Sequence, residues 1–182
     1  MLSVFRNMFR VPDLRNKVLF TLFVIFVYRI GSSIPVPGID FDAVLSLREQ
    51  ANQGGFVGLL SLFSGGALTN FAVFALGIMP YITSSIIMQL LTQVIPKLRQ
   101  WSDEGEVGRK RITQWTRYVT VGLAILQSTG IVYLFTRGSG NQLGVGTPLL
   151  PEGEDTLLRR ALIILTLTAG TAVIMWLGEL IT

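Results

Sequence analysis

Four long apolar stretches constrain this chain more than any other feature. They cover residues 18–34, 71–95, 119–135 and 161–182. A helix needs about 20 residues to cross the hydrocarbon core of a bilayer, so each stretch is close to spanning length. Half of the residues are hydrophobic and only 14% are charged, whereas about a quarter are charged in soluble domains. The sequence therefore predicts an all-α membrane protein with about four transmembrane helices.

Basic residues are divided unevenly among the segments that connect these stretches. Ten lie in residues 1–17 or 96–118, and four lie in 35–55 or 136–160. Basic loops remain in the cytoplasm, so we expect the N-terminus and the 96–118 loop to be cytoplasmic and the other two connections to be external. The apolar spacing at the start of 1–17 suits an amphipathic helix in the inner headgroup layer, and a frayed terminus is the alternative.

A cleaved signal peptide also begins with basic residues and an apolar core. Arg29 interrupts the approach to the small residues that could form a cleavage site, and Pro35 and Pro37 follow closely. These residues favour a retained transmembrane helix at residues 18–34 rather than a cleaved signal peptide.

The chain contains neither cysteine nor histidine. Disulfides, thiolate or imidazole metal sites and histidine-based acid–base catalysis are therefore excluded. Every aspartate lies outside the four apolar stretches. We expect no enzymatic activity, no cofactor and no metal site.

The sequence LSLFSGGALTN (60–70) interrupts the apolar pattern just before the second stretch. As a helix, residues 56–68 would reach roughly 20 Å, which is less than the thickness of the bilayer core. We expect residues 56–70 to form a short re-entrant half-helix that enters from outside. Irregular backbone at this depth requires a protein cover or an adjoining cavity. A helix lying on the outer surface is the alternative.

The second stretch contains Pro80, flanked by Ile78 and Ile82. A proline inside a helix leaves a carbonyl without its donor, here that of Leu76, and bends the helix. The two isoleucines are four residues apart and therefore share one face. On the pattern alone, such residues face lipid or a neighbouring helix.

Four segments, in sequence order, carry a family resemblance. They are YRIGSSIPVPGID (28–40), LFSGGALTNFAVFALGIMPYITSSIIMQLL (62–91), EGEVGRKRITQWTRY (104–118) and MWLGELIT (175–182). Together they resemble the SecY family, the central subunits of a protein-conducting channel. The resemblance implies a ten-span protein of two halves, of which this chain would hold about four spans and the half-helix from the first half. We expect further spans beyond residue 182.

The resemblance also implies roles for individual residues. The half-helix would be the plug of the channel, with Leu59, Leu60, Leu62, Phe63, Ser64, Gly65, Gly66 and Leu68. The apolar pore ring would include Ile78 and Ile82, which seal by excluding water. One side of the lateral gate, which contacts signal sequences, would include Thr83, Ile86, Ile87 and Leu90.

The function implied by the resemblance is a channel that conducts secretory polypeptides across the bacterial cytoplasmic membrane and releases transmembrane helices sideways into lipid. The implied partners are the SecE and SecG subunits, a SecA motor or a ribosome, nascent chains with their signal sequences, and membrane lipids. A secondary transporter with a discontinuous helix is the alternative. The scarcity of ionisable residues within the four stretches favours the channel.

Overall fold

The computed structural model describes residues 12–52, 58–59, 62, 64–136 and 157–181. Within these residues the chain is helical, apart from turns and an isolated bridge between Pro35 and Ala72. The helices are α2 (Pro12–Gly31), α3 (Phe41–Asn52), α5 (Met79–Val94), α6 (Pro96–Asp103), α7 (Glu106–Thr136) and α8 (Leu157–Ile181). The prediction of an all-α chain is confirmed for this part of the sequence.

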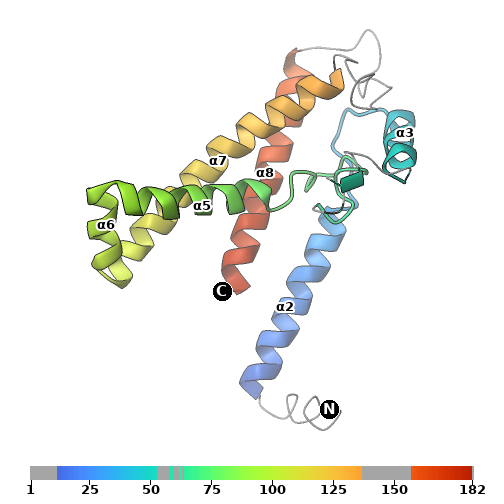
Figure 1. Ribbon diagram of the computed structural model, residues 1–182. Coiled ribbons are helices and arrows are strands. Elements are labelled where there is room, and N and C mark those ends of the chain that lie inside the picture. The colour runs from blue at the N-terminus through green and yellow to red at the C-terminus, as the bar shows by residue number, and fades with distance from the viewer. Residues whose placement is uncertain (1–11, 53–57, 60–61, 63, 137–156, 182) are drawn as a thin grey trace.

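The long helices place their ends on two sides of the fold (Figure 1). The starts of α2 and α7 and the end of α8 lie toward the lower side of the view, whereas α3, the end of α7 and the start of α8 lie toward the upper side. The predicted cytoplasmic segments therefore share one side, as the expected topology requires. The orientation of that side in a membrane remains a prediction.

Helix α8 is the one helix of the described residues that is long and apolar enough, by length and composition, to cross a membrane. Helices α2 and α7 contain 20 and 31 residues. Helix α5 contains 16 residues and would reach roughly 24 Å. The count of four spans remains a prediction.

The second apolar stretch is not one continuous helix. Residues 64–78, hereafter the turn segment, form successive turns, and the helix begins only at Met79. The φ angles of Phe71 and Gly77 are 41° and 57°, which are left-handed values that interrupt a right-handed helix. The structure thus begins this helix eight residues later than the predicted position, residue 71.

The expected bend at Pro80 does not occur, because Pro80 lies in the first turn of α5 and Ile78 is the N-cap. N–H groups of the first turn have no partner within the helix, so a proline there removes no hydrogen bond. The prediction that Pro80 deprives the Leu76 carbonyl of its helical donor is therefore wrong. Leu76 precedes the helix and is buried in the turn segment.

Other boundaries also differ from the prediction. Helix α2 ends at Gly31 rather than 34, and α3 occupies much of the expected external connection 35–55. Helix α6 and the first part of α7 occupy the expected loop 96–118. The predicted amphipathic segment lies mainly in residues 1–11, outside the described part of the chain, as do residues 137–156.

The turn segment supplies much of the apolar core. One buried cluster consists of Val36, Leu68, Phe71, Ala75, Leu76, Val132, Ile163 and Leu167, and a second consists of Ala67, Ala72, Phe74 and Ile174. Backbone hydrogen bonds connect the turns, for example from the Ala72 N–H to the Ala67 carbonyl at 2.8 Å. The irregular backbone of the turn segment is therefore covered by apolar side chains and joined by internal hydrogen bonds. Irregular backbone within a membrane requires such cover.

Buried hydroxyl groups join α5, α7 and α8. Ser84 of α5 hydrogen-bonds with Thr120 of α7, and Ser128 of α7 lies 3.5 Å from the Thr168 hydroxyl of α8. Ser84, Thr120 and Ser128 are fully buried. Small hydroxylated residues allow helices to approach closely and to hydrogen-bond across the interface. This packing fixes α5 against α7, and α7 against α8.

Candidate pore and gate site

The exposed side of helix α5, together with its N-cap residue Ile78, carries the predicted pore and gate residues. Ile78 and Ile82 are 40% and 43% exposed, and Ile86 and Leu90 are 52% and 60% exposed. Their spacing of four residues aligns these four side chains in one line, hereafter the α5 ridge. The other side of the helix is buried through Pro80, Ser84 and Met88. The two pore-ring residues and two of the gate residues therefore form one continuous apolar surface.

The remaining predicted gate residues border this ridge. Ile87 is 36% exposed, and the Thr83 hydroxyl donates a hydrogen bond to the Met79 carbonyl at 3.0 Å. Because the Thr83 hydroxyl is satisfied within its own helix, it adds little polarity to the surface. An apolar surface of this length indicates contact with lipid or with another polypeptide.

The predicted plug residues divide into two groups. Leu59 and Leu62 are helical and are 60% and 77% exposed. Ser64, Gly65, Gly66 and Leu68 belong to the turn segment, in which Ser64 and Leu68 are buried. Leu60 and Phe63 lie outside the described residues. Exposed helical residues thus precede a turn that is buried at Ser64 and Leu68.

The two glycines allow this turn to form. Gly65 and Gly66 have φ angles of 59° and 84°, which glycine adopts without the steric cost that a side chain brings. The Leu68 N–H donates to the Ser64 hydroxyl at 3.1 Å, and the Thr69 hydroxyl donates to the Gly66 carbonyl at 2.9 Å. Local hydrogen bonds therefore close the turn.

The end of α2 holds the same turn from a distant part of the sequence. Tyr28 donates a hydrogen bond to the Ser64 carbonyl at 3.1 Å, and Arg29 donates to the Gly65 carbonyl at 3.4 Å. The Tyr28 ring also stacks on Phe74, with ring centroids 5.7 Å apart. Sequence reasoning missed both roles of Tyr28. The only signal was that Tyr28 and Arg29 begin one of the family-like segments.

Two glycines permit close approach to the turn segment. A Cβ atom at Gly170 of α8 would lie 2.1 Å from the Val73 carbonyl oxygen, and one at Gly31 of α2 would lie 2.1 Å from the Phe74 ring. Side chains at these positions would therefore push the turn segment away from α8 and α2. Both helices position the segment through their glycines.

An apolar cavity of about 250 Å³ lies beside Ile78, between α2 and α8. Its lining residues are Val24, Ile25, Tyr28, Ile78, Ile174, Leu177, Gly178 and Ile181. Tyr28 is the lining residue that also holds the turn at Ser64. The cavity, the turn and the start of the α5 ridge are therefore neighbours in space.

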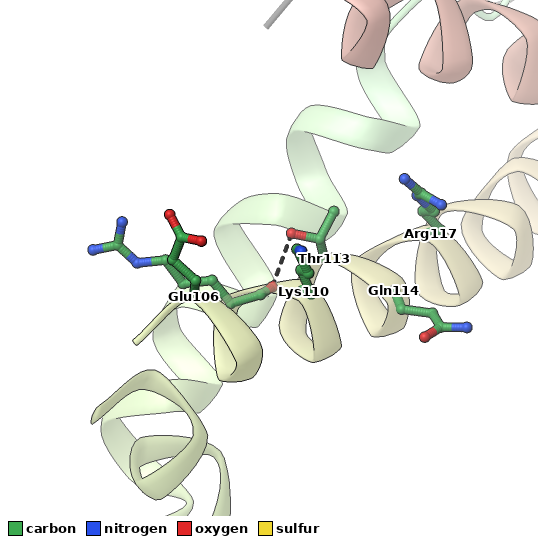
Figure 2. Close-up of a pocket in the computed structure, with 6 residues that line it drawn as sticks. Glu106, Lys110, Thr113, Gln114 and Arg117 are labelled. Atoms are coloured by element: carbon green, nitrogen blue, oxygen red, sulfur yellow. Dashed lines mark hydrogen bonds between the residues drawn. The ribbon is translucent and has the colours of Figure 1, made fainter. Parts of the chain in front are cut away.

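The start of α7 forms a separate polar surface (Figure 2). An open groove runs along this helix and is lined by Glu106, Arg109, Lys110, Thr113, Gln114 and Arg117. Their spacing of three or four residues places them on one side of the helix. This surface coincides with the basic segment from which we predict a cytoplasmic location.

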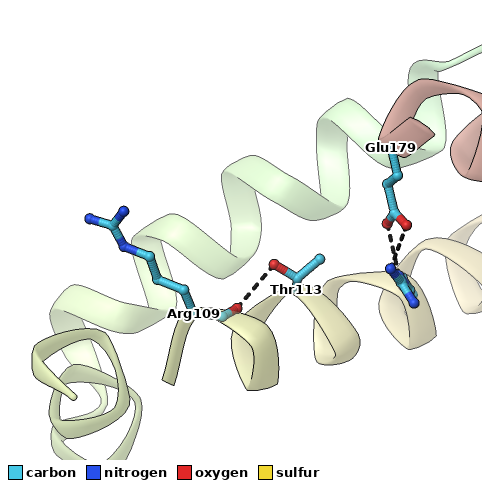
Figure 3. A network of polar contacts seen from close by, with 4 residues as sticks. Arg109, Thr113 and Glu179 are labelled. Carbon is cyan, nitrogen blue, oxygen red and sulfur yellow. Dashed lines mark hydrogen bonds and ion pairs between the residues drawn. The ribbon is translucent and has the colours of Figure 1, made fainter. Parts of the chain in front are cut away.

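An ion pair connects this surface to the end of α8 (Figure 3). Arg117 donates two hydrogen bonds to the Glu179 carboxylate, including one from Nε to Oε1 at 2.8 Å. The hydrogen bond to Glu179 raises the pKa of Arg117 above its ordinary value, so the guanidinium stays charged. The pair ties the start of α7 to α8. Elsewhere in the described residues, no group of three or more acidic side chains is placed so that it could hold a metal ion.

Comparison with known proteins identifies the family. A family model for SecY matches residues 72–182, which is more than half of the chain. The chain belongs to the SecY family. The predicted family resemblance is therefore confirmed.

Curated relatives extend the match to the whole chain. Proteins named "Protein translocase subunit SecY" are 50% identical over 183 residues in Streptomyces griseus, 51% over 185 in Streptomyces coelicolor and 45% over 185 in Mycobacterium tuberculosis. Each alignment covers 100% of this chain, and it covers 41%, 42% and 41% of these relatives respectively. The chain thus spans about two fifths of the length of the SecY proteins it matches.

Proposed function

We propose that this chain forms part of the wall, the gate and the plug of a protein translocase channel in the bacterial cytoplasmic membrane. The SecY relatives, each named as a protein translocase subunit, support this role. The observation that carries the proposal is the α5 ridge, because Ile78 and Ile82 stay exposed while the opposite side of α5 is packed. An apolar surface of this kind can seal a channel at its constriction by excluding water.

In this proposal, Ile78 and Ile82 contribute to the pore ring. Apolar side chains at a constriction exclude water and thereby block ions, yet they can move aside for a passing polypeptide. The gate residues Ile86, Ile87 and Leu90, with Thr83 beside them, would contact the apolar core of a signal sequence. The continuity of the α5 ridge would let a signal sequence leave the pore toward lipid along one surface.

The proposed plug comprises residues 56–70, which would close the pore from outside. The exposed Leu59 and Leu62 would face the pore, and the buried residues Ser64, Ala67 and Leu68 of the following turn would anchor them. The basic start of α7 would face the cytoplasm together with the N-terminus. There a SecA motor or a ribosome would dock, and SecE, SecG and lipids would surround the channel.

A secondary transporter would use a discontinuous helix to bind a solute with polar groups. The cavity beside Ile78 is lined by apolar side chains together with Tyr28 and Gly178, and it contains no carboxylate or basic group among its lining residues. This chemistry favours a seal over a solute-binding site. The proposed role is transport of polypeptides through a channel and involves no enzymatic step.

The ring assignment can be tested in the full-length translocase that contains this chain. Replacing both Ile78 and Ile82 with serine should wet the constriction and raise the conductance of the resting channel in planar bilayers. The matched control is Leu162→Ser with Leu165→Ser, two exposed leucines of α8 that lie outside the α5 ridge. It should leave conductance unchanged.

The opposite result would contradict the proposal. If Ile78 and Ile82 face lipid, serine at both positions would expose hydroxyl groups to hydrocarbon and reduce insertion or stability. The inserted channels would then conduct like the parent. Movement of small solutes without movement of secretory polypeptides by the reconstituted protein would favour the transporter instead.

A further inference from the structure

Two consecutive residues of α2 donate hydrogen bonds to two consecutive carbonyls that lie 36 residues further along the chain. Tyr28 reaches the Ser64 carbonyl and Arg29 reaches the Gly65 carbonyl, at 3.1 Å and 3.4 Å. The ideal Cβ position at Gly65 lies only 3.5 Å from the Tyr28 hydroxyl oxygen. The last turn of α2 therefore lies directly against the turn formed by residues 64–67.

On its outer side, this turn consists of two glycines, and its hydrogen bonds there are local or come from α2. Gly65 is exposed, and a Cβ atom at Gly66 would meet no other atom within 4 Å. Both glycines have positive φ angles and carry no side chain that could anchor them. On the inner side, by contrast, Ala67 and Leu68 are buried in the apolar clusters. The restraint from α2 thus acts on the side of the turn that carries no side chains of its own.

We propose that Tyr28 and Arg29 are positioning residues that hold the turn at residues 64–67 in place, with Tyr28 providing the stronger restraint. Tyr28 is half-buried and is fixed by stacking on Phe74, and its hydrogen bond is the shorter of the two. Arg29 is exposed. A fixed ring directs its hydroxyl at the carbonyl with little loss of side-chain freedom.

The inference rests on the proposed function only where it connects this turn to channel leakage. Leu59 and Leu62 precede the turn in sequence, so release of the turn would loosen the proposed plug. Tyr28 also lines the cavity beside Ile78. Tyr28 therefore contacts the turn that would anchor the proposed plug, and it lines the same cavity as Ile78 of the proposed pore ring.

The test uses a single cysteine as a local reporter in the full-length translocase, with any cysteine elsewhere in that protein replaced. Thr69 is 7% exposed, and its hydroxyl closes the turn onto Gly66. Thr69→Cys replaces this hydroxyl with a thiol and removes one methyl group, so every labelling rate is compared with that of the Thr69→Cys protein that keeps Tyr28. Reaction of the thiol with a soluble reagent reports opening of the turn. Tyr28→Phe removes the hydroxyl and keeps the stacked ring. Loss of one hydrogen bond should raise the labelling rate about two- to tenfold.

A second reporter separates local release from general destabilisation. Ser128 of α7 is fully buried and lies outside the turn segment. With Ser128→Cys as the reporter, Tyr28→Phe should leave the labelling rate unchanged. Tyr118→Phe, at an exposed tyrosine of α7, should change neither reporter. Arg29→Gln should raise Thr69→Cys labelling by less than Tyr28→Phe does.

The outcomes are distinct. Unchanged labelling of Thr69→Cys in the Tyr28→Phe protein, or an equal rise at both reporters, would overturn the inference. Faster labelling only at Thr69→Cys, together with a higher resting conductance, would support both the inference and the proposed plug. Faster labelling without any change in conductance would support the positioning role of Tyr28 and contradict the plug assignment.

Discussion

A methyl group at Gly170 tests whether the turn segment packs directly on α8. The added Cβ atom would lie 2.1 Å from the Val73 carbonyl oxygen and 2.9 Å from the carbonyl carbon. Ordinary contacts begin near 3.4 Å, so the two elements must move apart by about 1 Å. The obstructing atoms belong to the backbone and cannot rotate away as a flexible side chain could.

The free-energy change can be worked out from two opposing effects. Overpacking a well-packed site costs about 1–3 kcal/mol, and a clash with backbone places Gly170→Ala near the upper end. Alanine is favoured over glycine within a helix by about 1 kcal/mol, which offsets part of this cost. We therefore expect Gly170→Ala to lower the free energy of unfolding by about 2 kcal/mol. The melting temperature would therefore fall by a few degrees.

The assay is thermal unfolding of the purified full-length protein in detergent, followed by tryptophan fluorescence. Gly122→Ala is the matched control, because Gly122 also lies within a helix but a Cβ atom there would meet nothing within 4 Å. Its melting temperature should equal or exceed that of the parent, because helix propensity acts alone. If Gly170→Ala melts at or above the parent temperature, as Gly122→Ala should, the close contact with Val73 is refuted.

Three further predictions concern topology and packing. A cysteine at the exposed Ser102 should react with an impermeant reagent only from the cytoplasmic side, and labelling from outside would contradict the orientation. A double-mutant cycle on Arg117 and Glu179 should give a coupling of about 0.5–1 kcal/mol that weakens as salt increases, and a salt-independent coupling would argue against a partly exposed ion pair. Ser84→Ala should destabilise the protein by about 1 kcal/mol through loss of the buried bond to α7, whereas Thr129→Ala, at an exposed hydroxyl, should change melting little.

Hydropathy and local residue chemistry determined much of the fold class. The apolar run at 161–182 corresponds closely to α8, and the run at 119–135 lies within α7. These helices can be predicted because about 20 apolar residues without glycine–proline clusters have few alternatives to a helix in an apolar environment. The interruption at residues 60–70 was also visible in the sequence, since Ser64, Gly65 and Gly66 break the apolar pattern.

The start of the second helix could not be predicted from hydropathy. Phe71, Phe74 and Leu76 are as apolar as residues of a spanning helix, yet they are buried in turns. Hydropathy records burial and does not distinguish a helix from turns whose backbone groups are satisfied by other parts of the protein. The interpretation of Pro80 changed with that boundary, because the same proline bends a helix from within but begins one without cost.

Only the tertiary structure decided which distant residues support the candidate site. Tyr28 and Ser64 are 36 residues apart, and Arg117 and Glu179 are 62 residues apart. Gly170 meets Val73 because α8 returns past the turn segment. Residue types and local spacing identify what each segment prefers, whereas these contacts depend on how separate helices approach one another. That approach is determined by packing across the whole fold, which no local pattern of residues contains.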